Sequence, residues 1–158
     1  MTKAKEWFTG SGDNILFEEI LKIIKDHSSQ GGTVYIGSDS MVHKQKCVFC
    51  TAICLIGDTK ESNRYFVRRT RSDAKEFKTL LQRITKEVQH SIDMGMRLLE
   101  YCPTIKIELH LDVSSTNKKS KTSKFADMLV GYAKGSGFDC KIKPEAFAAY
   151  CVADKHSK

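Results

Sequence analysis

The amino-acid sequence predicts an α/β fold built on a mixed five-stranded sheet, with a helix added before the sheet. Three observations predict this class. Three strand-like segments follow one another between residues 33 and 71 with short links, which is typical of an antiparallel meander. The hydrophobic spacing then changes to a helical period from Asp73 to about Tyr101. After that helix the order is strand, helix, strand, helix.

The first half of the chain supplies the meander. Residues 1–12 are polar and predict a flexible N-terminal arm, and residues 13–158 are expected to form a single domain. A helix follows the arm, with Asp13 as an N-cap candidate, and it ends near His27. The three predicted strands cover residues 33–40, 46–57 and 64–71.

The second half alternates helices and strands. Pro103 ends the long helix, and the next predicted strand covers residues 106–115. A lysine-rich loop leads to a helix over residues 122–134, which glycines close. A short fifth strand over 138–143 and a short terminal helix complete the predicted order.

Composition limits the class of protein. The chain has 158 residues and a formal net charge of +7, which favours polyanionic partners. We expect no membrane span, because the apolar runs are far shorter than the roughly 20 residues required. The six cysteines and the absence of a secretory signal predict a cytoplasmic protein. The spacing of Cys47 and Cys50 within one strand places them on opposite faces, which argues against a shared metal or disulfide.

Carboxylates recur at the ends of predicted elements. Asp39 closes the first strand, after Val34 and Ile36 on one face and Tyr35 on the other. Asp112 lies near the end of the fourth strand. If these strands are parallel neighbours, both carboxylates emerge at the same edge of the sheet, where open α/β sheets place their sites.

Further carboxylates could join this pair. Asp154 lies in an otherwise apolar C-terminal segment, and Glu76 and Glu87 lie three turns apart on the long helix. Converging carboxylates need a counter-charge, and the hard cations Mg²⁺ or Mn²⁺ prefer oxygen ligands. Two such ions about 4 Å apart would hold the attacking and leaving oxygens of a phosphoryl displacement.

The chain carries four short motifs: Gly37–His43 (GSDSMVH), His110–Ser114 (HLDVS), Lys143–Phe147 (KPEAF) and Val152–His156 (VADKH). Together with the element order, these motifs resemble the ribonuclease H-like superfamily, and most closely its bacterial YkuK-like family. The resemblance covers about residues 15–158. It implies a ribonuclease H-like fold with Asp39, a helix glutamate, Asp112 and Asp154 as catalytic ligands of two metal ions. The chain lacks the extra basic helix that some ribonucleases H use to grip hybrids, so hybrid specificity is not implied.

The helix glutamate has two candidates. The spacing from Asp39 and the position near the helix start favour Glu76, as in ribonucleases H proper. The run Arg83–Ser91 (RITKEVQHS) resembles the YkuK-like family and favours Glu87. We prefer Glu87 and keep Glu76 as the alternative.

Basic side chains indicate where nucleic acid could bind. One group lies just beyond Asp112, where lysines and helix N–H groups could hold a phosphate backbone: Lys118, Lys119, Lys121 and Lys124. A second group crowds the third strand and could equally protect a sheet edge: Arg64, Arg68, Arg69 and Arg71. His43 and His156 could shuttle a proton or be plain surface residues, and His110 could be packed against a neighbour.

The leading interpretation is a metal-dependent nuclease that hydrolyses phosphodiester bonds by a two-metal mechanism. The alternatives are a non-catalytic nucleic-acid-binding module on the same fold and a protein-interaction scaffold. The sequence leaves open DNA against RNA, endonuclease against exonuclease action, and the oligomeric state.

Overall fold

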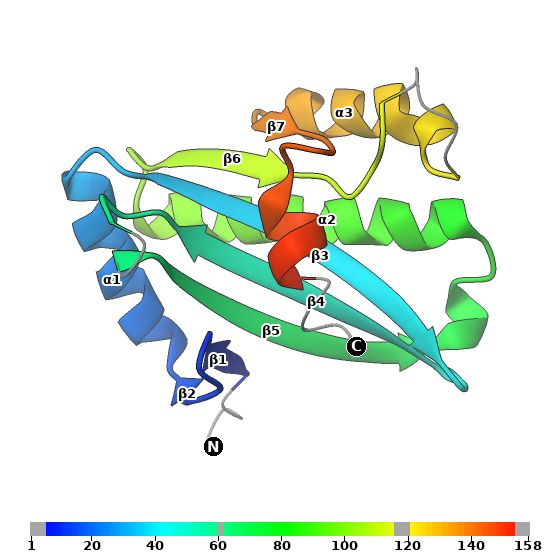
Figure 1. Cartoon of the computed structure of the whole chain (residues 1–158), viewed down its shortest axis with the longest axis horizontal. Coiled ribbons are helices and arrows are strands. Elements are labelled where there is room, and N and C mark those ends of the chain that lie inside the picture. The colour runs from blue at the N-terminus through cyan, green and yellow to red at the C-terminus, as the bar shows by residue number, and fades with distance from the viewer. Residues whose placement is uncertain (1–5, 60–61, 116–120, 154–158) are drawn as a thin grey trace.

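A seven-stranded mixed sheet organises the described part of the chain, which comprises residues 6–59, 62–115 and 121–153. In this computed structural model the strand order is β2-β1-β5-β4-β3-β6-β7 (Figure 1). Strands β3, β4 and β5 form an antiparallel meander, whereas β6 lies parallel to β3 and β7 lies parallel to β6. The bounds are β1 Trp7–Thr9, β2 Asn14–Ile15, β3 Thr33–His43, β4 Lys46–Leu55, β5 Arg64–Asp73, β6 Lys106–His110 and β7 Asp139–Lys141.

The expected count of five strands is wrong, because two short strands precede the first helix. Strand β1 pairs with β5, and the guanidinium of Arg68 lies over the buried ring of Trp7. Part of the expected arm therefore belongs to the sheet. Asp13 is also not an N-cap: its backbone closes the turn between β1 and β2, and the helix begins after Leu16.

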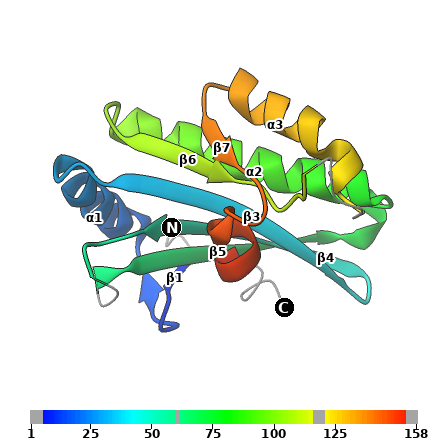
Figure 2. The same cartoon turned by 45° about the horizontal axis from the view of Figure 1, so that its top comes forward.

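Three α-helices of the described residues cover one face of the sheet. Their apolar residues share one core with Val34 and Ile36 of β3, as the alternation along that strand predicts. Figure 2 shows α3 beside α2 on this side. The helices are α1 Phe17–Ser29, α2 Leu80–Tyr101 and α3 Ala126–Gly135.

The expected helix from Asp73 to Tyr101 is divided in two. A short 3-10 turn, η2 (Ala74–Glu76), precedes α2. Helix α2 begins after Thr79, whose hydroxyl accepts a hydrogen bond from the Gln82 backbone, while the Gln82 side chain accepts one from the Thr79 backbone. This capping box fixes the helix start. Glu76 consequently lies before the helix and is exposed.

The C-terminal segment covers the opposite face of the sheet. Its helical turn η4 (Ala148–Ala153) lies in front of β3 and β4 in Figure 1. A second apolar cluster, which includes Cys50, Ala52 and Ala148, holds it there. An added Cβ on Gly37 would lie 2.4 Å from the backbone nitrogen of Ala149, so only glycine permits this approach.

None of the helices in the described ranges combines the length and the hydrophobicity that a membrane crossing requires. Cys47 and Cys50 are buried free thiols, and burial raises the pKa of Cys50 to about 12.

Candidate metal centre

Strands β3 and β6 separate at one end of the sheet. Their parallel pairing runs from Thr33 and Lys106 to Gly37 and His110, and β3 then continues alone on that side to His43. The prediction that these strands are parallel neighbours is confirmed. Asp39, however, lies inside β3 opposite Cys50 rather than at the strand's end.

Three carboxylates meet where the strands separate. Asp39 lies two residues beyond the last β3–β6 pair, and Asp112 lies two residues beyond the end of β6. Glu87 reaches the same place from α2. One oxygen from each of the three carboxylates lies within 4.8 Å of the others. We call these residues the carboxylate cluster.

Hydroxyl groups connect α2 to β3 beneath the cluster. The Ser40 hydroxyl donates a hydrogen bond of 2.5 Å to Glu87 Oε2. The hydroxyl oxygens of Ser38 and Ser91 lie 2.9 Å apart, and that of Ser38 lies 3.2 Å from that of Thr51. Sequence reasoning missed these serines. The alternation of the strand could have indicated Ser38 and Ser40, because residues 38 and 40 continue the face of Val34 and Ile36 with small polar side chains.

The cluster concentrates negative charge in a buried place. Burial raises the pKa of Glu87 to about 8, and the charge of Asp112 adds to this effect. The hydrogen bond from Ser40 and the charges of Arg83 and Lys143 act in the opposite direction. Glu87 therefore strongly favours its protonated form at neutral pH unless a cation compensates its charge.

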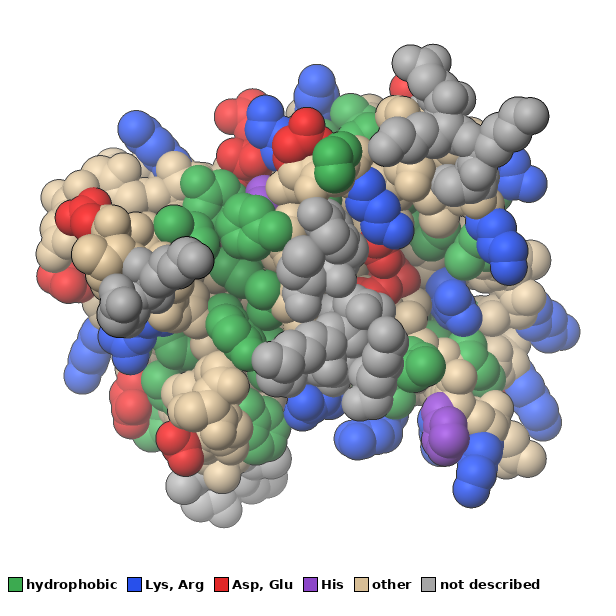
Figure 3. All heavy atoms as spheres, in the orientation of Figure 1, with side chains coloured by type: hydrophobic (Ala, Val, Ile, Leu, Met, Phe, Trp, Pro, Cys, Tyr) green, Lys and Arg blue, Asp and Glu red, His purple; other side chains and the backbone are tan. Residues whose placement is uncertain are grey.

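A lysine lies against the cluster. Lys143 Nζ is 2.8 Å from Asp112 Oδ1. Burial alone would lower the pKa of Lys143, but the hydrogen bond to Asp112 and the charges of all three carboxylates raise it. Figure 3 shows acidic side chains near the middle of this face with basic side chains beside them.

The residues present suit a hard divalent cation. Carboxylate oxygens are the ligands that Mg²⁺ and Mn²⁺ prefer, and three of them converge here. Burial raises the pKa of Glu87 and an ammonium lies on Asp112, so ionising all three carboxylates requires added positive charge. A buried divalent cation would supply it.

Other predicted site residues lie apart from the cluster or outside the described residues. Exposed Glu76 lies on η2 and is not among the clustered carboxylates. His43 is exposed at the end of β3. Outside the described residues lie Asp154, His156, Lys118 and Lys119.

Two groups of basic residues line hollows in the described part of the chain. Lys121 and Lys124 are exposed beside the start of α3 and line a hollow with Thr79 and Phe125. Lys44 and Lys46 of the β3–β4 hairpin, which sequence reasoning did not select, line a second hollow together with His43, Arg69 and Arg71.

The arginines of β5 also contact aromatic rings. The guanidinium of Arg64 lies 5.8 Å from the Phe66 ring and that of Arg69 lies 6.0 Å from the Phe8 ring. Strand β1 pairs with residues 66–68 of β5, so it covers part of the edge of this strand and not its whole length.

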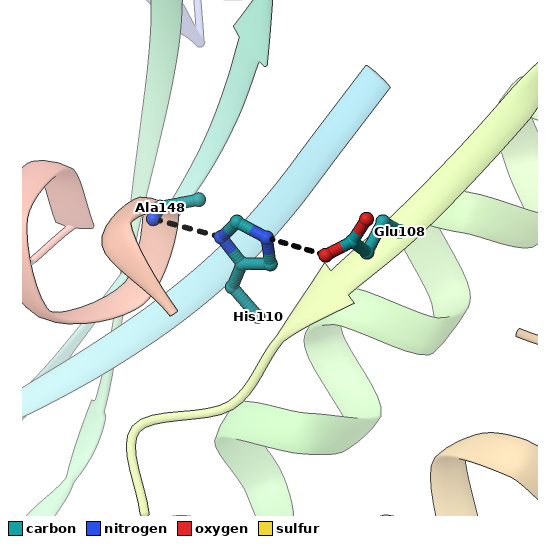
Figure 4. Close-up of polar contacts among 3 residues, drawn as sticks. All are labelled: Glu108, His110 and Ala148. Atoms are coloured by element: carbon teal, nitrogen blue, oxygen red, sulfur yellow. Dashed lines mark hydrogen bonds and ion pairs between the residues drawn. The ribbon is translucent and has the colours of Figure 1, made fainter. Parts of the chain in front are cut away.

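His110 fastens the C-terminal segment to the sheet (Figure 4). Its Nδ1 accepts a hydrogen bond from the Ala148 backbone N–H at 3.1 Å, and its Nε2 lies 3.2 Å from Glu108 Oε1. The ring packs between Tyr35 and Phe147. Since Nδ1 is an acceptor, the proton of the neutral ring is on Nε2 and is donated to Glu108. His110 thus packs as a structural residue beside the cluster.

The mixed sheet and the carboxylates at its open end place the chain in the ribonuclease H-like class of α/β folds. The family model described as "Ribonuclease H-like" matches residues 15–158, so the chain belongs to this family. This match confirms the resemblance stated from the sequence motifs. A search of the curated proteins finds no match to the chain.

Proposed function

We propose that this protein is a divalent-cation-dependent nuclease that hydrolyses phosphodiester bonds at the carboxylate cluster. The observation that carries the proposal is the convergence of Asp39 from β3, Glu87 from α2 and Asp112 from the segment that follows β6. Membership of the ribonuclease H-like family supports it.

Asp39, Glu87 and Asp112 would hold Mg²⁺ or Mn²⁺, and we propose two ions, with Asp154 as a fourth ligand. When bound, such ions polarise the phosphodiester and lower the pKa of a bound water. The chain's own residues do the positioning: Ser40 orients Glu87 by its hydrogen bond, and α2 holds Glu87 away from bulk water.

The charge distribution supports nucleic acid as the substrate class. The chain carries a net charge of +7, although the proposed catalytic residues are acidic. In Figure 3, basic side chains gather to the right of the acidic ones. Basic side chains also line two hollows, one with Lys121 and Lys124 and one beside the β3–β4 hairpin. The cations of these two groups could bind the phosphates that flank a scissile bond.

The test is cleavage of labelled single-stranded, duplex, hybrid and branched DNA and RNA with Mn²⁺, Mg²⁺ or EDTA. We expect metal-dependent cleavage that Asp39→Asn and Asp112→Asn each reduce at least about 100-fold. Glu76→Gln is the matched control, because it changes an exposed carboxylate outside the cluster and should retain activity.

Two outcomes would contradict the proposal. Salt-sensitive binding without cleavage would identify a nucleic-acid-binding module instead. The absence of both cleavage and binding would favour a protein-interaction scaffold.

A further inference from the structure

Lys143 is held beside the carboxylate cluster by its backbone. The Leu111 N–H donates to the Lys141 carbonyl and the Lys143 N–H donates to the Val113 carbonyl, each at 2.9 Å. These bonds continue the β6–β7 alignment beyond the ends of both strands. The backbone thereby fixes Lys143 next to Asp112.

The ammonium of Lys143 faces the cluster on one side and solvent on the other. Its Nζ lies 2.8 Å from Asp112 Oδ1, and the side chains are 37% and 17% exposed, respectively. The charges of Asp39 and Glu87 also act on Lys143. This ion pair is therefore part of the cluster and differs from a solvated surface pair.

A divalent cation and this ammonium compete for the same charge. A cation that coordinates Asp112 binds the same carboxylate that Lys143 contacts, and its two positive charges repel the ammonium. Lys143 can move its ammonium towards solvent while its backbone stays fixed, because its long side chain is partly exposed.

We propose that Lys143 is the built-in counter-ion of the carboxylate cluster, which gives up Asp112 when a divalent cation binds and then contacts a substrate phosphate. This inference rests on the proposed function, since it assigns a role in the same site. The ammonium neutralises part of the cluster in the metal-free protein. After the metal binds, the ammonium stays at the solvent-exposed side of the cluster, because the backbone hydrogen bonds of residues 141 and 143 fix the position of Lys143.

The test measures Mn²⁺ binding directly, by electron paramagnetic resonance and calorimetry, in the full chain without substrate. Lys143→Met should bind Mn²⁺ about tenfold more tightly, because the competing charge is gone. Lys143→Arg retains the charge and should stay within about threefold of the wild type. Lys141→Met is the matched control, because it removes an exposed lysine two residues away and should leave Mn²⁺ affinity unchanged.

A second readout tests the phosphate contact. At saturating Mn²⁺, Lys143→Met should bind a labelled single-stranded oligonucleotide at least threefold more weakly than Lys141→Met does. Tighter metal binding with weaker nucleic-acid binding is not expected of a purely structural lysine. Circular dichroism and thermal unfolding would establish that each variant is folded.

The outcomes separate this inference from the proposed function. Equal or weaker Mn²⁺ binding by folded Lys143→Met would overturn the role of Lys143, while cleavage by the wild type would leave the proposed function intact. If neither the wild type nor Lys143→Met binds Mn²⁺, both the inference and the metal-dependent function are wrong.

Discussion

Replacing Glu87 by Gln should stabilise the metal-free protein. The amide has nearly the shape of the carboxylate, its oxygen can accept the hydrogen bond from Ser40, and its NH₂ group can donate to the neighbouring carboxylates. The substitution removes the cost of ionising a buried carboxyl group. Folding stability should therefore rise at neutral pH, although a proposed metal ligand is lost.

The magnitude follows from the pKa of Glu87, which burial raises from 4.5 to about 8. A raised pKa in the folded state means that the stability from the protonated group is fully present below pH 4.5. It is lost progressively as the pH rises from 4.5 to about 8 and is absent above that. At about 1.4 kcal/mol per pH unit, the full loss is on the order of 5 kcal/mol, and at pH 7 it is about 3 kcal/mol.

The assay is urea unfolding in EDTA at several pH values between 4 and 9. The stability difference between Glu87→Gln and the wild type should grow from near zero at the lowest pH to about 1–3 kcal/mol at pH 7, allowing for relaxation around the buried charge. Glu76→Gln is the control, since this exposed glutamate should give no such pH-dependent difference. Mn²⁺ should stabilise the wild type and reduce the gap.

A constant difference across the pH range would refute the reasoning, as would a Glu87→Gln protein that is less stable at pH 7 and above. Either result would mean that Glu87 is ionised and well compensated without a divalent cation.

Three further predictions concern the elements around the cluster. His110→Leu leaves the buried Ala148 N–H without its acceptor and should lower the free energy of unfolding in urea by about 1–3 kcal/mol. His110→Asn offers an oxygen acceptor and should lower it less, so equal losses in the two variants would contradict this prediction. Gly37→Ala places a Cβ against the backbone of η4 and should speed hydrogen exchange at Ala148, whereas unchanged exchange would contradict the close approach. Replacing Lys121 and Lys124 together by Ala should weaken nucleic-acid binding. It should also reduce the slope of the logarithm of the binding constant against the logarithm of the salt concentration by about 2, and an unchanged slope would exclude phosphate contacts from these lysines.

Long periodic segments made the strand–helix order predictable. Alternation in β3 placed Val34 and Ile36 in the core, and the parallel β3–β6 pairing brought Asp39 and Asp112 to one opening. Strand bounds were less accurate. Strand β3 continues to His43 because β4 pairs with it along the whole hairpin, which no local signal near Asp39 indicates.

Short elements were missed for a physical reason. Strands β1 and β2 contain three and two residues, which is too few for a hydrophobic period to be visible. The start of α2 could have been predicted, because Thr79 and Gln82 have the spacing of a capping box. Recognising it would have placed Glu76 outside the helix.

The contact between Lys143 and Asp112 had no local sequence signal, although Lys143 begins one of the four motifs. Lys143 follows a short strand and reaches Asp112 only because residues 141–143 bond to residues 111–113. Such a contact depends on the register of two segments about 30 residues apart in the chain. Periodicity and propensity carry no information about that register.

The most direct test of the central claim is an anomalous diffraction map of crystals grown with Mn²⁺. The account predicts an anomalous peak bonded to oxygens of Asp39, Glu87 and Asp112 at about 2.0–2.3 Å, with Lys143 moved away from Asp112. A cluster without any anomalous peak, in which Lys143 still pairs with Asp112 at saturating Mn²⁺, would contradict it.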